Sequence, residues 1–383
     1  MDDARIDALL AAWLRGEKGV VLDANLEASC GPVLERIDFH GIAGLLSAEL
    51  RDQVSLPDVL ARALRDRAIA LAFWEANHAR MLGRVLPALA ARGIAPLLFK
   101  GTALAFSHYA DPAARARGDT DMLVAPDEFD RAGEVLTGLG FATPLLAGGS
   151  VISVEKTFTF TDPAGVEHDI DLHGRLNNAA ILARLFAYEE LLGRAVDLPG
   201  LSPGARSVGA VDALLIACMH RMVHLQAPYY VNAIAYRSAN RLIWLHDIHL
   251  LASRFSASDW DGFLTLAHRK GLAQVCAGGL RSARDALATR LPKGLFQDLG
   301  ARKGQEIPAR YLAAGPLGQT VMKLRAEDGL ARKARFLREL MLPPAEYMRA
   351  RFSDVRPSWL PWLYVARAIG GLWKLGPGRT RAK

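Results

Sequence analysis

The sequence predicts an α+β protein, in which a small mixed sheet with flanking helices follows an N-terminal helical region and precedes a helical C-terminal domain. Apolar residues recur at three- and four-residue spacing through residues 58–91, which is the periodicity of an amphipathic helix. The pattern changes at Gly93 to short apolar and alternating runs, which are typical of strands. Helical spacing returns from about Val211 to Leu291. These changes predict four regions, at residues 1–92, 93–205, 206–300 and 301–383.

Four segments after Gly93 have strand patterns. Residues 95–99 (APLLF) form a short apolar run, which indicates a buried strand, and residues 121–125 (DMLVA) indicate a second one. Residues 153–160 and 166–173 both alternate apolar and polar side chains, and the turn residues TDPAG separate them. This spacing predicts a hairpin.

The connections between these strands are predicted to be helices and one loop. Residues 102–109 have a helical pattern, and residues 110–118 (ADPAARARG) are predicted to form a loop. A second helix is predicted over residues 126–139, because it begins at a proline and has acidic residues in its first turn.

Composition restricts the class of protein. With 51% hydrophobic and 23% charged residues over 383 positions, the chain is expected to be globular and large enough for two or three domains. Its three cysteines, Cys30, Cys218 and Cys276, are far apart and form no CxxC pair, so we expect neither a disulfide framework nor a cysteine zinc site. We read no signal peptide and no membrane-spanning run, and we expect a cytoplasmic protein.

Carboxylates on the predicted strands form the main candidate site. Side chains two residues apart on a strand point to the same face, so Asp119 and Asp121 reach one cation together. Asp169 and Asp171 repeat this spacing, with His173 on the same face. Oxygen ligands of this kind suit Mg²⁺ or Mn²⁺, and such a cluster is what metal-assisted phosphoryl or nucleotidyl transfer requires. The structural alternative is an ordinary DxD pair, which is frequent on strands.

A glycine turn lies upstream of the carboxylates. Lys100, Gly101 and Thr102 precede a predicted helix, whose free backbone N–H groups can hold phosphate oxygens while glycine permits their close approach. Lys100 is expected either to contact a phosphate or to pair with a neighbouring carboxylate. Arg115 is expected either to neutralise a triphosphate oxygen or to face solvent, and Arg117 is expected to be solvated.

Residues 100–124 (KGTALAFSHYADPAARARGDTDMLV), followed by DLH at 171–173, resemble the signature KGxAL…YxDPxxRxxxDxDxLV. This signature is that of uncharacterised bacterial nucleotidyltransferases related to DNA polymerase β. The matching residues are Lys100, Gly101, Tyr109, Asp111, Pro112, Arg115, Asp119, Asp121, Asp171, Leu172 and His173. The resemblance extends to residues 212–225 and 240–251, which are similar to the helical second domain of this family, and covers about residues 90–290.

The resemblance implies a polymerase β-like core, an NTP as co-substrate and Mg²⁺. It implies Asp119 and Asp121 as paired metal ligands and Asp171 as the third carboxylate, with Asp169 as the alternative. Thr102 stands where the wider superfamily has serine or glycine. The implied reaction transfers a nucleoside monophosphate to a hydroxyl or phosphate acceptor and releases pyrophosphate.

The sequence does not identify the acceptor, because natural-product, saccharide, lipid-linked and protein groups all fit the resemblance. A toxin-like enzyme that modifies tRNA or protein is one alternative. A non-catalytic nucleotide-binding regulatory module is the other.

The second helical region holds an HxxxH pair, His220 and His224. Arg221 stands where a zinc protease has glutamate, so we expect packed histidines and no zinc site. Asp247 is expected to cap or brace His220.

The C-terminal tail is basic and aromatic. From residue 331 to 383 it has twelve Lys and Arg against three Asp and Glu, which accounts for the net charge of +7. Its aromatic residues include Trp359, Trp362, Tyr364 and Trp373. This composition suits a nucleic acid or an anionic membrane surface. We expect the tail to pack on the protein's own helical domain, because Pro357 and Pro361 interrupt a helix. The sequence does not determine the oligomeric state.

Overall fold

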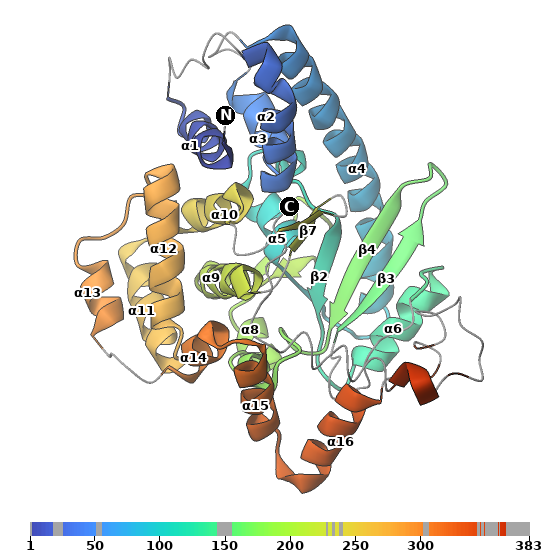
Figure 1. The fold of residues 1–383 in the computed structure, drawn as a ribbon. Helices are drawn as coiled ribbons and strands as arrows, with labels where there is room; N and C mark the ends of the chain where they lie inside the picture. Colours follow the sequence, from blue (N-terminus) through green and yellow to red (C-terminus); the bar gives the residue numbers. More distant parts are fainter. Residues whose placement is uncertain are drawn as a thin grey trace.

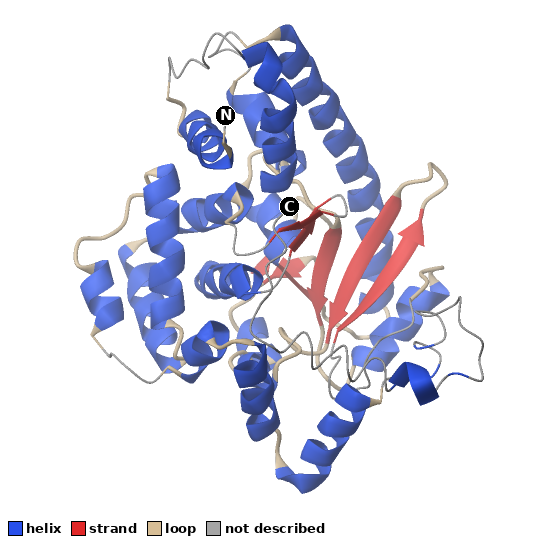
Figure 2. Ribbon diagram, in the orientation of Figure 1, coloured by secondary structure: helices blue, strands red, loops and turns tan. Residues whose placement is uncertain are grey.

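The computed structural model has a central sheet surrounded by helices (Figures 1 and 2). The residues that the structure describes are 2–17, 26–50, 56–143, 155–226, 229–231, 234–236, 240–301, 306–342, 345, 348, 359 and 361–364.

The N-terminal region is helical, as predicted. Its helices are α1 (Asp3–Leu14), α2 (Leu26–His40), α3 (Ala43–Glu49) and α4 (Asp58–Ala90). The side chain of Asp2 accepts a hydrogen bond from the Arg5 N–H at 2.9 Å and caps the start of α1. The C-terminal half of α4 packs on the sheet through buried side chains that include Met81, Leu82 and Val85.

In the part of the chain that the structure describes, the central sheet has six strands in the order β3-β4-β2-β1-β6-β5. The strands are β1 (Leu97–Phe99), β2 (Asp119–Leu123), β3 (Glu155–Thr161), β4 (Glu167–His173), β5 (Val196–Asp197) and β6 (Arg206–Ser207). β1 pairs antiparallel with β2 and parallel with β6, and β2 pairs parallel with β4. β3 and β4 form the predicted hairpin. The mixed sheet confirms the predicted α+β class, and the two-residue strands β5 and β6 were not foreseen.

The two faces of the sheet have different neighbours. Leu98, Met122 and Ile170 pack with α4 and with α6 (Phe129–Gly138). Leu97 and Phe99 point to the opposite face and join the core of the helical region. Because side chains alternate along a strand, Asp119 and Asp121 share the face of Phe99, towards the helices that follow.

The connections between the strands agree broadly with those that the sequence predicts. α5 (Lys100–His108) begins directly after β1, and a single 3₁₀ turn, η1 (Pro112–Ala114), lies within the predicted loop. The short helices after the hairpin are α7 (Ala180–Ala183) and α8 (Tyr188–Leu192).

The second helical region contains one interruption that the sequence interpretation missed. Its helices are α9 (Ala210–Gln226), α10 (Leu242–Ser253), α11 (Ala257–Arg269), α12 (Ala273–Leu287) and α13 (Leu295–Gly300). A short antiparallel pair, β7 (Tyr229–Val231) and β8 (Ile234–Tyr236), separates α9 from α10. Aromatic and β-branched residues in this stretch suit strands, but its short length hid the pattern.

The described residues 306–342 form three further helices. They are α14 (Ile307–Ala313), α15 (Pro316–Ala326) and α16 (Gly329–Met341). Most of the predicted basic and aromatic tail beyond residue 342 lies outside the described residues. None of the described helices is both long and apolar enough to cross a bilayer.

Candidate functional site

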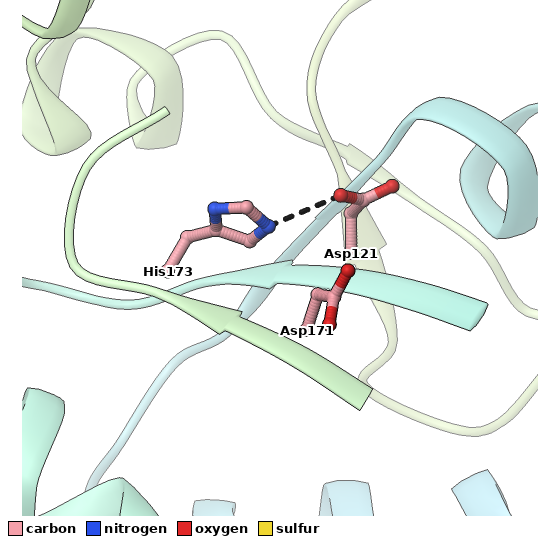
Figure 3. Close-up of side chains that lie close together, drawn as sticks. All are labelled: Asp121, Asp171 and His173. Atoms are coloured by element: carbon pink, nitrogen blue, oxygen red, sulfur yellow. Dashed lines mark hydrogen bonds and ion pairs between the residues drawn. The ribbon is translucent and has the colours of Figure 1, made fainter. Parts of the chain in front are cut away.

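The parallel pairing of β2 with β4 brings Asp121 and Asp171 together with His173, whereas Asp119 and Asp169 lie outside this close group. Asp119 lies opposite Asp169, and Asp121 lies opposite Asp171, on adjacent strands. Oxygens of Asp121 and Asp171 and a ring nitrogen of His173 lie within 4.8 Å of one another (Figure 3). The pairs of carboxylates at i, i+2 therefore form one face, as the alternation predicted.

Asp121 is the centre of this cluster. Its Oδ1 accepts a hydrogen bond from the Lys100 ammonium group at 2.6 Å and lies 3.1 Å from Nε2 of His173. Nδ1 of His173 lies 3.6 Å from a carboxylate oxygen of Glu155 on β3. The ion pair between Lys100 and a carboxylate is one of the two roles expected for this lysine.

The carboxylates differ in their tendency to ionise. Burial, together with the negative charges of Asp121 and Asp171, raises the pKa of Asp119 to about 7. Burial also disfavours ionised Asp121, but Lys100 and His173 outweigh burial and hold the pKa of this carboxyl well below its usual range. The pKa of Asp171 is raised, chiefly by burial. A further cation near Asp119 and Asp171 would therefore stabilise the cluster.

Two threonines of β3 orient the carboxylates of β4. Thr157 donates a hydrogen bond to Asp171 at 2.6 Å, and Thr159 donates one to Asp169 at 2.6 Å. Their i, i+2 spacing in the sequence of the predicted strand could have identified them, because it places both on the carboxylate face. Of the two candidates for a third ligand, Asp171 is the one that lies beside Asp121 and His173.

The glycine turn joins β1 to α5. Lys100 has a φ of +57°, a left-handed conformation that is rare for residues other than glycine. Gly101 is packed closely, since a Cβ there would lie 3.2 Å from Cδ of Arg117. The Thr102 hydroxyl is fully buried and lies 2.8 Å from the hydroxyl of Thr120. The turn thus directs Lys100 towards the carboxylates and the Thr102 hydroxyl towards the protein interior.

Arg115 is buried and forms a paired contact with the helical region. Its Nε and a terminal nitrogen donate to the two oxygens of Asp247 on α10, at 2.9 and 2.7 Å. Tyr109 donates a further hydrogen bond to Asp247 at 2.6 Å. Asp247 therefore holds Arg115 and Tyr109, and the expectation that it braces His220 was wrong.

Arg117 was expected to be solvated, which was wrong. Its side chain is 2% exposed and forms an ion pair with Glu75 of α4 at 2.7 Å. It also donates a hydrogen bond to the Thr102 hydroxyl at 2.9 Å. No local pattern identifies Glu75 as its partner, because the two residues are 42 positions apart.

A second buried polar network lies behind the carboxylate face. Thr120, which points away from Asp119 and Asp121, lies 2.6 Å from Nε2 of His78 on α4. Nδ1 of His78 lies 3.1 Å from Nδ1 of His168. Burial holds the pKa of His78 well below its usual value. This network holds β2 against α4, on the side of the strand opposite Asp119 and Asp121.

A cavity of about 100 Å³ opens beside Lys100, between the sheet and the helical region. Its polar lining includes Lys100, Arg115, His220 and Asp247, and most of the remaining lining is apolar. The cavity places residues from the core and from the helical region around one space next to the carboxylates.

The chain matches the family model of an uncharacterised nucleotidyltransferase over residues 28–288, which is more than half of its length. No curated protein matches the chain. The match includes the glycine turn, all the carboxylates of the sheet and the helices that carry His220 and Asp247. The chain belongs to this uncharacterised nucleotidyltransferase family.

Proposed function

We propose that the protein transfers a nucleoside monophosphate from an NTP to a hydroxyl or phosphate acceptor and releases pyrophosphate. Asp119, Asp121 and Asp171 are the proposed metal ligands and catalytic residues, and Asp169 is the alternative third ligand. The proposal rests chiefly on the register of β2 and β4, which sets Asp121 beside Asp171 on one face of the sheet.

The donor atoms of this face fit Mg²⁺ or Mn²⁺. Carboxylate oxygens are the ligands that both ions prefer, and a bound cation would favour the ionised forms of Asp119 and Asp171, whose pKa values are raised. When bound, such ions lower the pKa of an acceptor hydroxyl and neutralise charge on the triphosphate. Thr157 keeps the Asp171 carboxylate in place for this role.

The residues of the glycine turn would bind the triphosphate. The first N–H groups of α5 have no partner within the helix and carry partial positive charge, which suits phosphate oxygens. Gly101 allows close packing at the start of this helix, because a Cβ there would lie 3.2 Å from Cδ of Arg117. Lys100, which pairs with Asp121 in this structure, is close enough to the cluster to exchange that carboxylate for a phosphate oxygen.

Thr102 and Arg115 would act indirectly, by holding in place the segments that carry the triphosphate-binding and metal-binding residues. Thr102 connects the start of α5 to Thr120 between the two aspartates of β2. Arg115 lines the cavity beside Lys100 while its guanidinium stays bound to Asp247. This cavity is the proposed entrance for the reacting group of the acceptor, since it adjoins Lys100 and has both apolar and charged walls.

The test is transfer of label from each of four α-³²P NTPs in the presence of Mg²⁺ or Mn²⁺ and a lysate of the native host. We expect labelling with wild-type protein and none with Asp121→Asn. Asp197→Asn is the matched control, because Asp197 is an exposed carboxylate on β5 of the same sheet. Labelling by Asp121→Asn at the wild-type rate would refute the proposed site. Lack of labelling by wild-type protein that still binds Mg²⁺–NTP would favour the regulatory module.

A further inference from the structure

The last described helices expose an unusual number of large apolar side chains. Thirteen such side chains are exposed in the described residues, and nine of them lie at or beyond Ile307. The nine are Ile307, Leu317, Val321, Leu330, Leu337, Met341, Leu342, Trp359 and Trp362. Large apolar side chains that gather on one part of a surface indicate contact with another molecule or a membrane.

On α16 these side chains form one stripe. Leu330, Leu337 and Met341 are seven and four residues apart, so they lie on one face of the helix. Leu330 is 86% exposed and Met341 is 53% exposed. Phe336 and Glu339 lie on the other side of the helix and are buried. The apolar stripe therefore points away from the protein.

Basic side chains flank the stripe. In helical projection Lys333 lies on one side of Leu330 and Arg338 on the other. Neither forms an ion pair with another described residue. The acidic residues nearest in sequence are already paired: the buried Glu327 and Glu339 with Arg332 and Arg335, and the exposed Asp328 with Arg184. The uncompensated charge beside the apolar stripe is thus positive.

The neighbouring helix α15 also exposes apolar side chains next to a basic one. Leu317 and Val321 are four residues apart and exposed, and Arg325 lies one turn further along. In Figure 1, α15 and α16 form a pair at the lower end of the molecule, away from α1 and α4. Both helices therefore present apolar side chains bordered by basic ones at one end of the protein.

We propose that α15 and α16 form a docking surface for an anionic lipid bilayer. An amphipathic helix lies in a membrane interface when its apolar face enters the acyl boundary and flanking Lys and Arg contact anionic headgroups. A nucleic acid would use the basic residues but would leave the aliphatic stripe exposed to water. Trp359 and Trp362 are exposed further along the chain, and tryptophan is enriched at membrane interfaces. This proposal does not depend on the transfer reaction.

The test is sedimentation of the full chain with phosphatidylcholine vesicles that contain or lack phosphatidylglycerol. We expect binding to the anionic vesicles, weak binding to the neutral ones, and weaker binding at high salt because screening reduces the attraction of the basic residues. The double variant Leu330→Glu, Leu337→Glu should bind anionic vesicles at least about tenfold more weakly, since it loses apolar burial and adds repulsion.

The matched control is Val59→Glu, Ile69→Glu on α4. These two side chains are 60% and 67% exposed, so the control changes the same charge at exposed apolar positions elsewhere. It should bind vesicles as the wild type does. A second variant, Lys333→Gln, Arg338→Gln, should lose the preference for anionic over neutral vesicles. Circular dichroism and melting temperature establish that each variant is folded.

Three results would overturn the proposal. The first is a wild-type chain that does not sediment with anionic vesicles. The second is unchanged binding by the folded Leu330→Glu, Leu337→Glu variant. The third is a dimer in light scattering that the same double variant dissociates, because the stripe would then belong to an interface between two copies. Binding of RNA in place of vesicles, with loss only in the Lys333→Gln, Arg338→Gln variant, would also contradict it.

Discussion

The ammonium group of Lys100 lies 2.6 Å from Oδ1 of Asp121, so the carboxylate that aligns with Asp171 already holds a cation. Lys100 reaches this position from a left-handed backbone conformation that costs roughly 1–2 kcal/mol in a residue with a Cβ. Strain of this kind persists where the surrounding structure holds the residue in place, and it is concentrated at functional sites. In the proposed reaction Lys100 and a divalent ion share or exchange Asp121.

This relationship predicts two opposite effects of Lys100→Met. Without nucleotide, the variant should bind Mn²⁺ more tightly than the wild type, because Asp121 no longer has a competing cation. The KM for NTP should rise about tenfold or more, as expected for the loss of a charged hydrogen bond to phosphate. Calorimetric titration with Mn²⁺ and steady-state kinetics check the two effects. Lys156→Met is the control, because among the described residues Lys156 forms its ion pair with the exposed Asp130. Weaker Mn²⁺ binding by Lys100→Met would contradict the exchange.

Asp171→Asn and Asp169→Asn should differ in their effect on transfer. Each carboxylate accepts one hydrogen bond from a threonine of β3 at the same distance, so the two variants are structurally matched. Only Asp171 shares the cluster with Asp121 and His173, so its variant should lose at least about 100-fold in kcat/KM, roughly 2.7 kcal/mol of transition-state stabilisation. Asp169→Asn should keep most of the activity. The reverse order in kinetic assays would make Asp169 the third ligand.

Breaking the contact between Arg115 and Asp247 should destabilise the fold. Both side chains are buried, and Asp247→Ala leaves the Arg115 charge and the Tyr109 hydroxyl without this partner, at a cost of about 3–5 kcal/mol. Urea unfolding measures this change. The exposed pair Arg284 and Asp285 provides the comparison, because Asp285→Ala should cost at most about 1 kcal/mol.

A second variant tests whether Arg115 contributes to the transfer reaction in addition to stabilising the fold. Arg115→Met combined with Asp247→Leu replaces the buried pair by apolar side chains and should recover much of the lost stability. If this stable double variant also transferred label at the wild-type rate, Arg115 would have no part in the reaction.

Buried histidines predict a loss of stability in mild acid. Burial lowers the pKa of His78 well below 6.5 and that of His246 to about 4, so the folded protein keeps both neutral while the unfolded chain binds protons. Their contribution is complete above about pH 6.5 and decreases as the pH falls towards the folded values. Urea unfolding at about pH 7.5 and about pH 5 should show this decrease. His78→Gln, which keeps a polar group able to bond Thr120, should reduce it, and an unchanged pH dependence would show that His78 does not contribute.

Local sequence patterns determined which segments form helices and strands, and on which side of each strand a side chain lies. The alternation in DTDML and HDIDLH places each pair of carboxylates on one side of its strand, because strand side chains repeat every two residues. The same periodicity identified the hairpin, and helical spacing identified α4, α9 and α12. Strands β5 and β6 escaped notice because two residues are too few to carry a pattern.

The tertiary structure decided which faces meet and which charges pair. β2 lies between β1 and β4, and the hydrogen bonds that set Asp121 opposite Asp171 join strands separated by two connections. The partner of Arg115 is 132 residues away on α10. Sequence spacing fixes the direction of a side chain because the backbone repeats locally. The neighbour that a side chain meets depends on which distant segments are buried together, and no local repeat records this.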